Sequence, residues 1–374
     1  MKALLISCFN WYKTRLQPIM ELLIQQGYDV TILISDFDHI QKKPLETKYN
    51  ECTYIHVPSY RSNLSIRRIW SHWYFGRKIS EWINDLRPDL IICQIPPNHV
   101  GKYCTKYKKQ NPNKKLIIDI IDLWPESFPI GKFKNSIPVK KWQKWRDDTI
   151  RVSDYVFTEC NLYQNRLKTI IESQKTSTLL LFKEQTSEEQ VLVEKIIQNR
   201  KKDGVIRFAY LGSMNNIIDI EGICRIIRRF VDQGYLCELR AIGNGDNKAR
   251  FKESVEACGC RAFFYGPIFE ERQKIELLAP CDYAFNMMKQ NISVGLSIKS
   301  IDYLSYGIPI INNIQGDTWE YVDNNPIGIN IKNYSMECLP RFDHKQVYSF
   351  YTTHFTKQVF INSVSQSLSE LTLS

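Results

Sequence analysis

The sequence predicts an α/β protein made of two doubly wound, Rossmann-like domains, and three observations lead to that prediction. The chain has 374 residues, enough for two domains that each bury a core of their own. Two apolar runs, residues 2–7 and 28–34, flank a helical pattern that ends at Gly27, and such a β-α-β opening indicates a parallel sheet with right-handed crossovers. After a very polar stretch, residues 183–204, the same alternation starts again at residue 206.

Composition indicates an ordinary globular protein that binds anions. Hydrophobic residues make up 43% of the chain and charged residues 24%. No window holds 18 consecutive apolar residues, and the N-terminus lacks the layout of a signal peptide, so we expect a cytoplasmic protein. The 11 cysteines have no zinc-site spacing and fit free thiols, so no metal site is expected.

The net charge of +10 predicts an anionic partner, such as a nucleotide-sugar, a lipid phosphate or an acidic membrane leaflet. No zinc-finger or RRM pattern accompanies the lysines, so nucleic acid is not expected as a partner.

The first domain is predicted to span residues 1–182. Short apolar runs bounded by turn residues predict its remaining strands. They fall at residues 89–93, 116–121, 154–160 and 178–182.

Residues 63–86 fit one long helix that ends before Pro88. Its basic residues and His72 fall off the apolar stripe, which predicts either a solvated basic face or a surface that sits on anionic lipid headgroups. The stripe expected to pack inward consists of Ile66, Ile69, Trp73, Gly76, Ile79, Ile83 and Leu86.

A second amphipathic helix is predicted at residues 137–149, where Trp142 and Trp145 lie among lysines. Membrane contact and packing against the neighbouring domain both explain that pattern.

The second domain is predicted to span residues 205–340, after a linker with a short exposed helix at residues 183–204. A helical segment, residues 341–374, follows it. Within the domain we expect strands at residues 206–212, 238–242, 262–265, 283–287 and 308–311, with helices between them.

Residues 293–313 contain the most informative helix start. Ser297 fits an N-cap and Gly307 a C′ residue, so a helix should run from about 298 to 306. Ile298, Ile301 and Leu304 share one face and should pack inward.

The start of this helix suits a nucleotide-sugar. A helix N-terminus presents unpaired N–H groups and partial positive charge to a phosphate. Lys299 adds a full charge, and Asp302 could accept hydrogen bonds from ribose hydroxyls. An ordinary surface helix with a Lys–Asp pair would show the same residues.

An acidic pair, Asp122 and Glu126, follows the strand predicted at residues 116–121. Ligands of parallel sheets bind at the carboxyl ends of the strands, so these carboxylates are candidates to orient or deprotonate an acceptor hydroxyl. A capping aspartate and a surface glutamate are the alternative interpretation.

Two of these stretches resemble a known family. Residues 293–313 are similar to the donor-binding motif of retaining GT-B glycosyltransferases of the GT4 type, in the subgroup that reads roughly Gly-Leu-Pro-x-Lys-x-x-Asp/Glu-Tyr-x-x-x-Gly-x-Pro-x-Ile. The hexapeptide at 122–127 resembles a motif of bacterial GT4 enzymes that build surface polysaccharide. The resemblance extends from residue 1 to about 330. It implies the GT-B fold, with two domains that face a central cleft and a C-terminal helix that crosses back to the first domain.

The resemblance also implies roles for individual residues. The loop that begins at residue 8 would bind the acceptor through Asn10 and Lys13, and Asp122 and Glu126 would be the catalytic candidates. The donor would contact Gly212, Ser213, Gly243, Ser297, Lys299, Ser300 and Asp302.

Three features of the sequence depart from the pattern of the family. Many GT4 members carry a glutamate at the position of Val294, and many relatives carry histidine or arginine at the position of Ile121. Most have an Arg/Lys pair after the glycine equivalent to Gly212, where this chain has asparagine and isoleucine.

The implied activity is metal-independent transfer of a sugar from a nucleotide-sugar to a lipid-linked or glycan acceptor, with retained configuration and no cofactor. The implied setting is assembly of capsule, O-antigen or exopolysaccharide at the inner face of the plasma membrane. Two alternatives stay open: a sugar-nucleotide epimerase of the same fold, and a non-catalytic, glycosyltransferase-like partner subunit.

Overall fold

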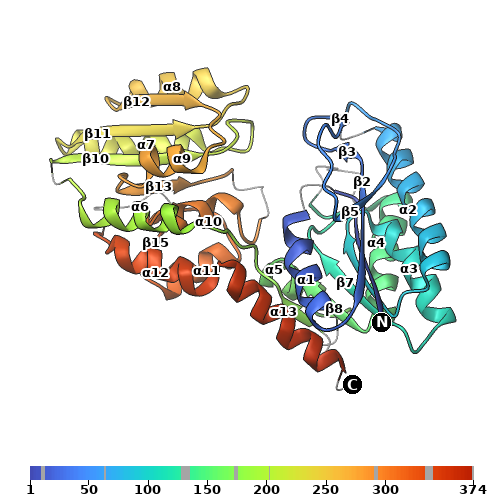
Figure 1. Ribbon diagram of the computed structural model, residues 1–374. Helices are drawn as coiled ribbons and strands as arrows, with labels where there is room; N and C mark the ends of the chain where they lie inside the picture. The colour runs from blue at the N-terminus through green and yellow to red at the C-terminus, as the bar shows by residue number, and fades with distance from the viewer. Residues whose placement is uncertain are drawn as a thin grey trace. The chain divides into compact units, whose positions relative to one another are not determined.

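In the computed structural model the chain divides into two compact units (Figure 1). Unit 1 contains residues 1–181 and 360–374, and unit 2 contains residues 182–359. The structure describes residues 1–9, 13–62, 65–127, 135–171, 176–201, 203–289, 294–332 and 340–372.

The two predicted acceptor-binding residues can be placed only in part. Asn10 lies outside the described residues, and Lys13 is described only as the first residue of helix α1.

Unit 1 is built on a parallel sheet of seven strands in the order β5-β2-β1-β6-β7-β8-β9. Apolar runs such as Leu90–Ile95 are buried along their whole length, as expected for a parallel sheet with helices on both faces. The strands are β1 (Lys2–Ser7), β2 (Asp29–Ser35), β5 (Cys52–Ile55), β6 (Leu90–Ile95), β7 (Lys115–Ile120), β8 (Tyr155–Thr158) and β9 (Thr176–Thr178), with a small antiparallel pair, β3 (Phe37–Asp38) and β4 (Lys43–Pro44).

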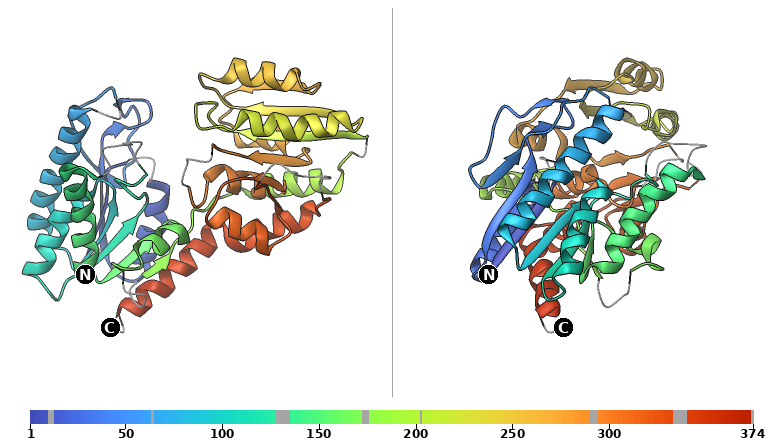
Figure 2. Two further views of the ribbon diagram at one scale, coloured as in Figure 1. Left: turned by 180° about the vertical axis from the view of Figure 1, so that it is seen from behind. Right: turned by 90° about the vertical axis from the view of Figure 1, so that its right-hand side faces the viewer.

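The helices of unit 1 cover both faces of this sheet (Figure 2). Helix α3 packs against both α2 and α4 on one face, and α1 lies on the other. The helices are α1 (Lys13–Gln25), α2 (Ile66–Leu86), α3 (Asn98–Gln110), α4 (Ile137–Val152) and α5 (Asn161–Leu167).

Unit 2 is built on a second parallel sheet, of six strands in the order β12-β11-β10-β13-β14-β15. Its strands are β10 (Val205–Leu211), β11 (Leu236–Ile242), β12 (Arg261–Gly266), β13 (Tyr283–Asn286), β14 (Ile310–Asn312) and β15 (Gly328–Asn330). Its helices are α6 (Ser187–Gln198), α7 (Ile220–Asp232), α8 (Lys248–Glu256), α9 (Glu271–Leu278), α10 (Ile298–Ser305), α11 (Asp317–Asn324) and α12 (His344–His354). The stretch predicted as a linker, residues 183–204, belongs to unit 2 and contains α6.

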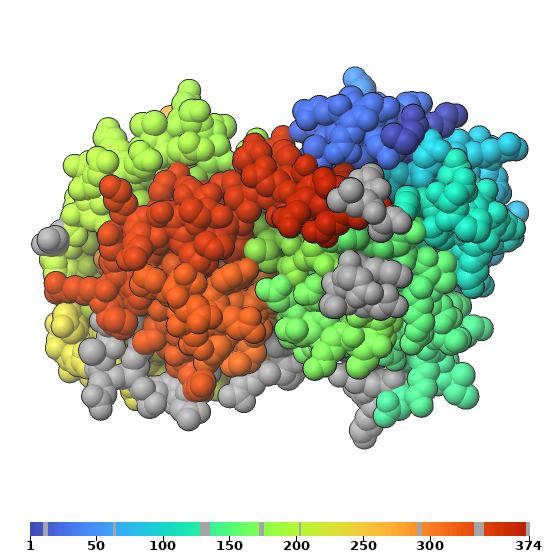
Figure 3. Space-filling view, turned by 90° about the horizontal axis from the view of Figure 1, so that it is seen from below, coloured from blue at the N-terminus to red at the C-terminus, as the bar shows by residue number. Residues whose placement is uncertain are grey.

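The last helix, α13 (Lys357–Thr372), passes from unit 2 into unit 1. Glu370 accepts a hydrogen bond of 2.7 Å from the Tyr155 hydroxyl, and the hydroxyls of Ser367 and Ser177 lie 2.8 Å apart. Figure 3 shows the end of this helix, in red, against the green part of unit 1. The predicted return of the C-terminal segment to the first domain is therefore confirmed.

The predicted inner face of α2 is wrong at its start. Ile66, Ile69 and Trp73 are 85%, 70% and 44% exposed, whereas His72 and Phe75 are buried. Most neighbouring residues of the predicted stripe are three positions apart, which is less than one helical turn of 3.6 residues. The stripe therefore drifts around the helix, and its first residues point away from the sheet.

The predicted inner face of α10 is wrong at one position. Ile301 and Leu304 are buried, but Ile298 is 54% exposed. Helical side chains tilt toward the N-terminus, so the side chain of this first residue projects past the end of the helix.

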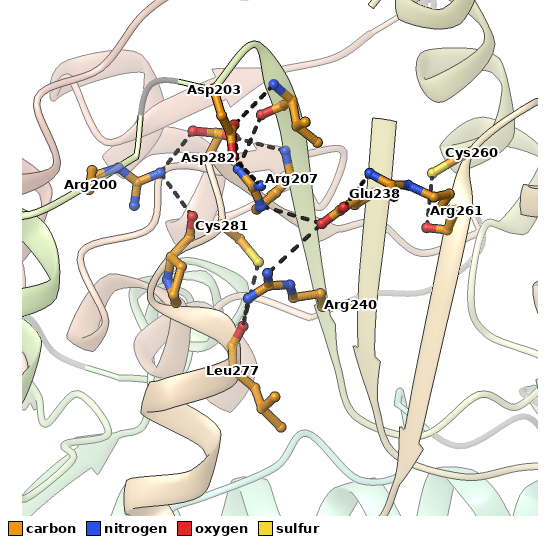
Figure 4. Close-up of polar contacts among 12 residues, drawn as sticks. Arg200, Asp203, Arg207, Glu238, Arg240, Cys260, Arg261, Leu277, Cys281 and Asp282 are labelled. Carbon is orange, nitrogen blue, oxygen red and sulfur yellow. Dashed lines mark hydrogen bonds and ion pairs between the residues drawn. The ribbon is translucent and has the colours of Figure 1, made fainter. Parts of the chain in front are cut away.

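A network of arginines and carboxylates ties the amino ends of the unit 2 strands together (Figure 4). Arg207 on β10 binds Asp203 at 2.7 Å and Glu238 on β11 at 3.3 Å, and Arg261 on β12 binds Glu238 at 2.7 Å. Asp282 receives the Arg207 backbone N–H at 2.7 Å. These charges stabilise the end of the sheet opposite the carboxyl edge described below.

Candidate functional site

The carboxyl edge of the unit 2 sheet contains most of the predicted donor-binding residues. The strand order reverses between β10 and β13, and ligands of open parallel sheets bind at such a switch point. The loop that follows β10 begins with Gly212 and Ser213, and Ser213 is exposed.

Two glycine loops at this edge lie backbone against backbone. Gly212 donates its N–H to Ile242 O at 3.0 Å, and Met214 donates to Asn244 O at 2.9 Å. Gly243 has φ +139°, and a Cβ at that position would lie 2.0 Å from Gly212 O. Only glycine fits there, so Gly243 shapes the loop that presents Gly212.

Gly212 itself has open space above it. Its φ is +125°, and a Cβ built there would meet no heavy atom within 4 Å. A ligand could therefore approach the backbone at this point.

Helix α10 begins at the same edge and is firmly capped. The Ser297 hydroxyl accepts the Ser300 N–H at 3.3 Å, lies 2.6 Å from the Ser300 hydroxyl and donates to Asn286 Oδ1 at 3.0 Å. Asn286 in turn donates to Asn312 at 2.8 Å, and Asn312 donates to Asn330 at 2.7 Å. This fully bonded ladder fixes the helix start, and within it Ser300 is completely buried.

Two tyrosines position Lys299 over the loop after β10. The Leu211 N–H donates to the Tyr303 hydroxyl at 2.7 Å, which docks α10 on the end of β10. Lys299 Nζ lies 5.5 Å from the ring centroid of Tyr210, whose hydroxyl donates to Ser213 O at 2.8 Å. Lys299 has no ion pair within the described residues, and burial lowers the pKa of its ammonium to about 8.

Asp302 is paired with a lysine that the sequence analysis did not single out. Lys183 Nζ lies 2.6 Å from Asp302 Oδ1, 2.5 Å from Glu271 Oε1 and 3.0 Å from the Tyr306 hydroxyl. Burial would raise the pKa of Glu271, but the charge of Lys183 and hydrogen bonds from Lys183, Tyr306 and Lys274 hold it at about 2. This ion pair engages Oδ1 of the Asp302 carboxylate.

The carboxyl edge of the unit 1 sheet holds the other predicted pair. Asp122 receives hydrogen bonds from the Leu123 N–H at 2.8 Å and from Trp124 Nε1 at 2.7 Å. Burial raises the pKa of Asp122, against hydrogen bonds from Ser127, Trp124, Leu123 and Tyr163 that lower it. This carboxylate is oriented and partly desolvated, as a group that binds or deprotonates a hydroxyl would be.

Glu126 has a strong partner on α4 that was not predicted from the sequence. Arg146 on α4, only 1% exposed, binds Glu126 at 2.6 Å and Asp147 at 2.9 Å. Gln143 also donates to Glu126, at 3.1 Å. Glu126 is therefore held in a salt bridge, and Asp122 is the better placed of the pair to act on a substrate.

A third carboxylate, Glu159, lies at the end of the neighbouring strand β8. It is 9% exposed, and its Oε2 has no hydrogen-bond partner in the described part of the chain. Burial raises its pKa to about 8; the charge of Arg15 opposes this, and those of Asp119 and Asp122 add to it. Glu159 is thus mostly protonated at neutral pH and can donate a hydrogen bond.

No family model and no curated protein sequence matches the chain. Solved structures do match it over its whole length. A lipopolysaccharide outer core galactosyltransferase, WaaB, covers 99% of this chain and of its own at 15% identity, with a TM-score of 0.68. Sucrose-phosphate synthase from Thermosynechococcus elongatus covers 100% and 99% at 12% identity, also with a TM-score of 0.68. The fold is GT-B.

The same GT-B architecture occurs in a UDP-GlcNAc 2-epimerase from Methanocaldococcus jannaschii. It matches with a TM-score of 0.52 at 12% identity and covers 100% of both chains. At such identities the likeness shows the GT-B fold and leaves the reaction to be argued from the residues.

The GT-B structure gathers the predicted residues into one group in each unit. Gly212, Ser213, Gly243, Ser297 and Lys299 share the edge in unit 2, and Asp122 and Glu126 share the edge in unit 1. Lys183, Arg146 and Glu159 were not predicted from the sequence. Glu159 is an acidic residue within the mostly apolar run of residues 155–160, and this was the one feature of the sequence that could have indicated a buried carboxylate.

Proposed function

We propose that the protein is a glycosyltransferase that moves a sugar from a nucleotide-sugar to an acceptor hydroxyl. The observation that carries this proposal is Lys299, an ammonium with no ion pair in the described residues, at the start of a capped helix beside the open backbone of Gly212. Lys299 is partly buried, and a partly buried positive charge costs free energy unless an anion meets it. A diphosphate supplies that anion and also fits the free N–H groups of the helix start.

In this proposal unit 2 binds the donor. Lys299 and the first amides of α10 stabilise the negative charge that develops on the departing diphosphate, and Asp302 accepts from the ribose. Ser297 and Ser300 act through the cap, which fixes the direction of those amides.

Unit 1 then supplies the groups that act on the acceptor. Asp122 orients or deprotonates the attacking hydroxyl, while Glu159 in its protonated form donates a hydrogen bond to an acceptor oxygen. Glu126 holds Arg146 in place behind them.

The finer assignments belong to the same proposal. They are membership of the GT4 family, retained configuration, a metal-independent reaction without a cofactor, and a lipid-linked or glycan acceptor used in surface-polysaccharide assembly at the inner face of the plasma membrane. The resemblance of residues 293–313 and 122–127 to GT4 motifs supports them, as does the likeness to a lipopolysaccharide galactosyltransferase.

The first experiment is a thermal-shift screen across nucleotide-sugars and nucleoside diphosphates, with wild type and Lys299→Ala side by side. A ligand that binds the folded state raises the melting temperature by mass action. We expect at least one to shift the wild type and to shift the variant less. Equal shifts in both proteins would contradict the placement of the diphosphate.

An epimerase is the second candidate, because a UDP-GlcNAc 2-epimerase shares the fold. Epimerisation needs no acceptor, so proton NMR of the shifted nucleotide-sugar with the protein alone separates the two. A new sugar isomer would favour the epimerase. Binding without epimerisation or transfer to any acceptor would favour a non-catalytic, glycosyltransferase-like subunit.

A further inference from the structure

Four large apolar side chains are exposed within the first eight residues of α2. Ile66 is 85% exposed, Ile69 70%, Trp70 54% and Trp73 44%. Ile137, the first residue of α4, is 83% exposed. Such side chains lower the solubility of a protein unless a partner covers them.

The starts of these two helices lie together, on either side of Trp124. Arg68 Cζ of α2 lies 4.7 Å from the Trp124 ring centroid, and the ring of Trp142 in α4 lies 5.7 Å from it. Because Trp124 also donates to Asp122 at 2.7 Å, the apolar side chains border the carboxylate proposed to act on the acceptor.

The starts of both helices are positively charged, and their own sequences contain no acidic residue. Residues 65–80 and 135–146 contain no Asp or Glu, and the first acids beyond them, Glu81 and Asp147, are bound by Lys78 and Arg146. Cations in the first turns of a helix are disfavoured by its dipole, so this charge is uncompensated within the helices. Its exposed members are Arg67, Arg77, Lys140, Lys141 and Lys144.

We propose that the starts of α2 and α4 form a docking surface for an anionic lipid bilayer. We call this set of exposed apolar and basic residues the α2–α4 surface. Basic residues supply attraction to acidic headgroups, and isoleucine and tryptophan side chains enter the boundary between headgroups and acyl chains. A soluble polyanion would use the charges but leave the isoleucines and tryptophans in water.

This inference rests on the proposed function and deepens it. A lipid-linked acceptor lies in the leaflet that the α2–α4 surface would contact. Docking at that surface would place Asp122 beside the headgroup region, where the sugar or phosphate end of such an acceptor is found.

The test is co-sedimentation of the full chain with vesicles of phosphatidylcholine, with and without phosphatidylglycerol. We expect at least tenfold tighter binding to the anionic vesicles, weakened by salt through screening. The double variant Ile69→Glu/Trp70→Glu should lose at least tenfold in affinity. The matched control is Phe269→Glu in unit 2, which replaces a side chain that is 90% exposed and should bind like the wild type.

Thermal melting and the nucleotide thermal shift show that each variant is folded and keeps its donor site. Equal binding to neutral and anionic vesicles, or unchanged binding of the double variant, would overturn the inference. The inference would also fail if soluble polyphosphate bound as tightly as the anionic vesicles and the double variant kept the wild-type affinity for both. If no nucleotide binds but vesicle binding follows the expected pattern, the proposed function fails and the docking surface stands.

Discussion

The two candidate edges differ in how completely their buried polar groups are hydrogen-bonded. In unit 2 the side chains under the helix start, from Ser297 through Asn286 and Asn312 to Asn330, bond one another in an unbroken series. In unit 1 several buried polar atoms have no hydrogen-bond partner in the described part of the chain, among them His72 Nε2, Gln94 Oε1, Asn98 Oδ1 and Glu159 Oε2. Within the part of the chain that the structure describes, no such atom lies in unit 2.

The difference teaches that the two units are prepared differently for their ligands. A satisfied polar network is rigid and holds one geometry, which suits a phosphate site that recognises the same group in every donor. Unsatisfied buried atoms cost free energy until a ligand or water bonds them. We infer that the unit 2 edge is preformed, whereas the unit 1 edge keeps polar atoms that an acceptor or water could bond.

The largest expected effect on stability comes from replacing Glu159, the buried carboxylate in unit 1 whose Oε2 has no hydrogen-bond partner among the described residues. Burial raises the pKa of Glu159 from 4.5 to about 8, so the contribution of this group to stability is complete below pH 4.5 and is lost as the pH rises through 8. Glu159→Gln should remove the loss, on the order of 4 kcal/mol at pH 9. Urea unfolding at pH 5 and pH 9 measures it. The exposed Glu81→Gln should keep the pH dependence of the wild type, and a variant with the same dependence as wild type would refute our account of Glu159.

The second largest expected effect on stability comes from a substitution in the glycine loops at the edge of unit 2. Gly243→Ala adds a Cβ that would lie 2.0 Å from Gly212 O, so we expect a loss of about 3 kcal/mol in unfolding free energy and weaker nucleotide binding. Gly204→Ala is the matched control, because Gly204 also has a positive φ, +77°, but has no heavy atom within 4 Å of the added Cβ. Equal losses in the two variants would show that the contact between the loops contributes nothing.

Removing the ion pair between Lys183 and Asp302 should have a smaller effect on stability. Lys183→Met leaves Asp302 and Glu271 without their shared cation, and we expect a loss of about 2 kcal/mol at pH 7. The folded pKa of Glu271 is about 2, so its stabilising contribution is present above pH 4.5 and is lost as the pH falls toward 2. The difference between wild type and variant in chemical unfolding should therefore shrink from pH 7 to pH 3. A constant difference would contradict the assignment.

The smallest expected change in free energy comes from replacing Lys299, and it tests the role of this residue in the donor site. Lys299→Ala should lower turnover at least tenfold, about 1.4 kcal/mol. Its pKa is lowered to about 8, so its charge costs stability below pH 8 and the cost disappears as the pH rises toward 10.5. The ligand-free variant should therefore be slightly more stable than the wild type at pH 7. Lys252→Ala, an exposed lysine of α8, should change neither quantity, and unchanged turnover of Lys299→Ala would count against the donor site.

The sequence predicted the architecture because apolar runs and turn residues repeat in both halves of the chain. It also predicted the start of α10, because the N-cap of Ser297 and the glycine at 307 are local signals. The inner face of α2 could not be predicted from the sequence, because the rotation of a helix about its own axis is set by its packing against the sheet. Only the folded structure shows that His72 rather than Trp73 faces inward.

The partners of the site residues were also beyond sequence reasoning. Lys183 lies 119 positions from Asp302 and Arg146 lies 20 from Glu126, and a basic residue gives no sign of which acid it will meet. Lys183 was placed in a linker because the stretch around it is polar. Glu159 was overlooked because burial, which sets its pKa, is a property of the folded chain.

The path of α13 has a consequence for how the protein is made. Unit 1 contains the first residues of the chain and also the last ones, whose Ser367 and Glu370 bond Ser177 and Tyr155. At roughly 5 to 20 residues per second, a ribosome needs roughly 10 to 40 s to pass from the end of the unit 1 sheet to the end of α13. During that time unit 1 lacks its closing helix, and a chaperone that holds the nascent unit would be released only once α13 has been made.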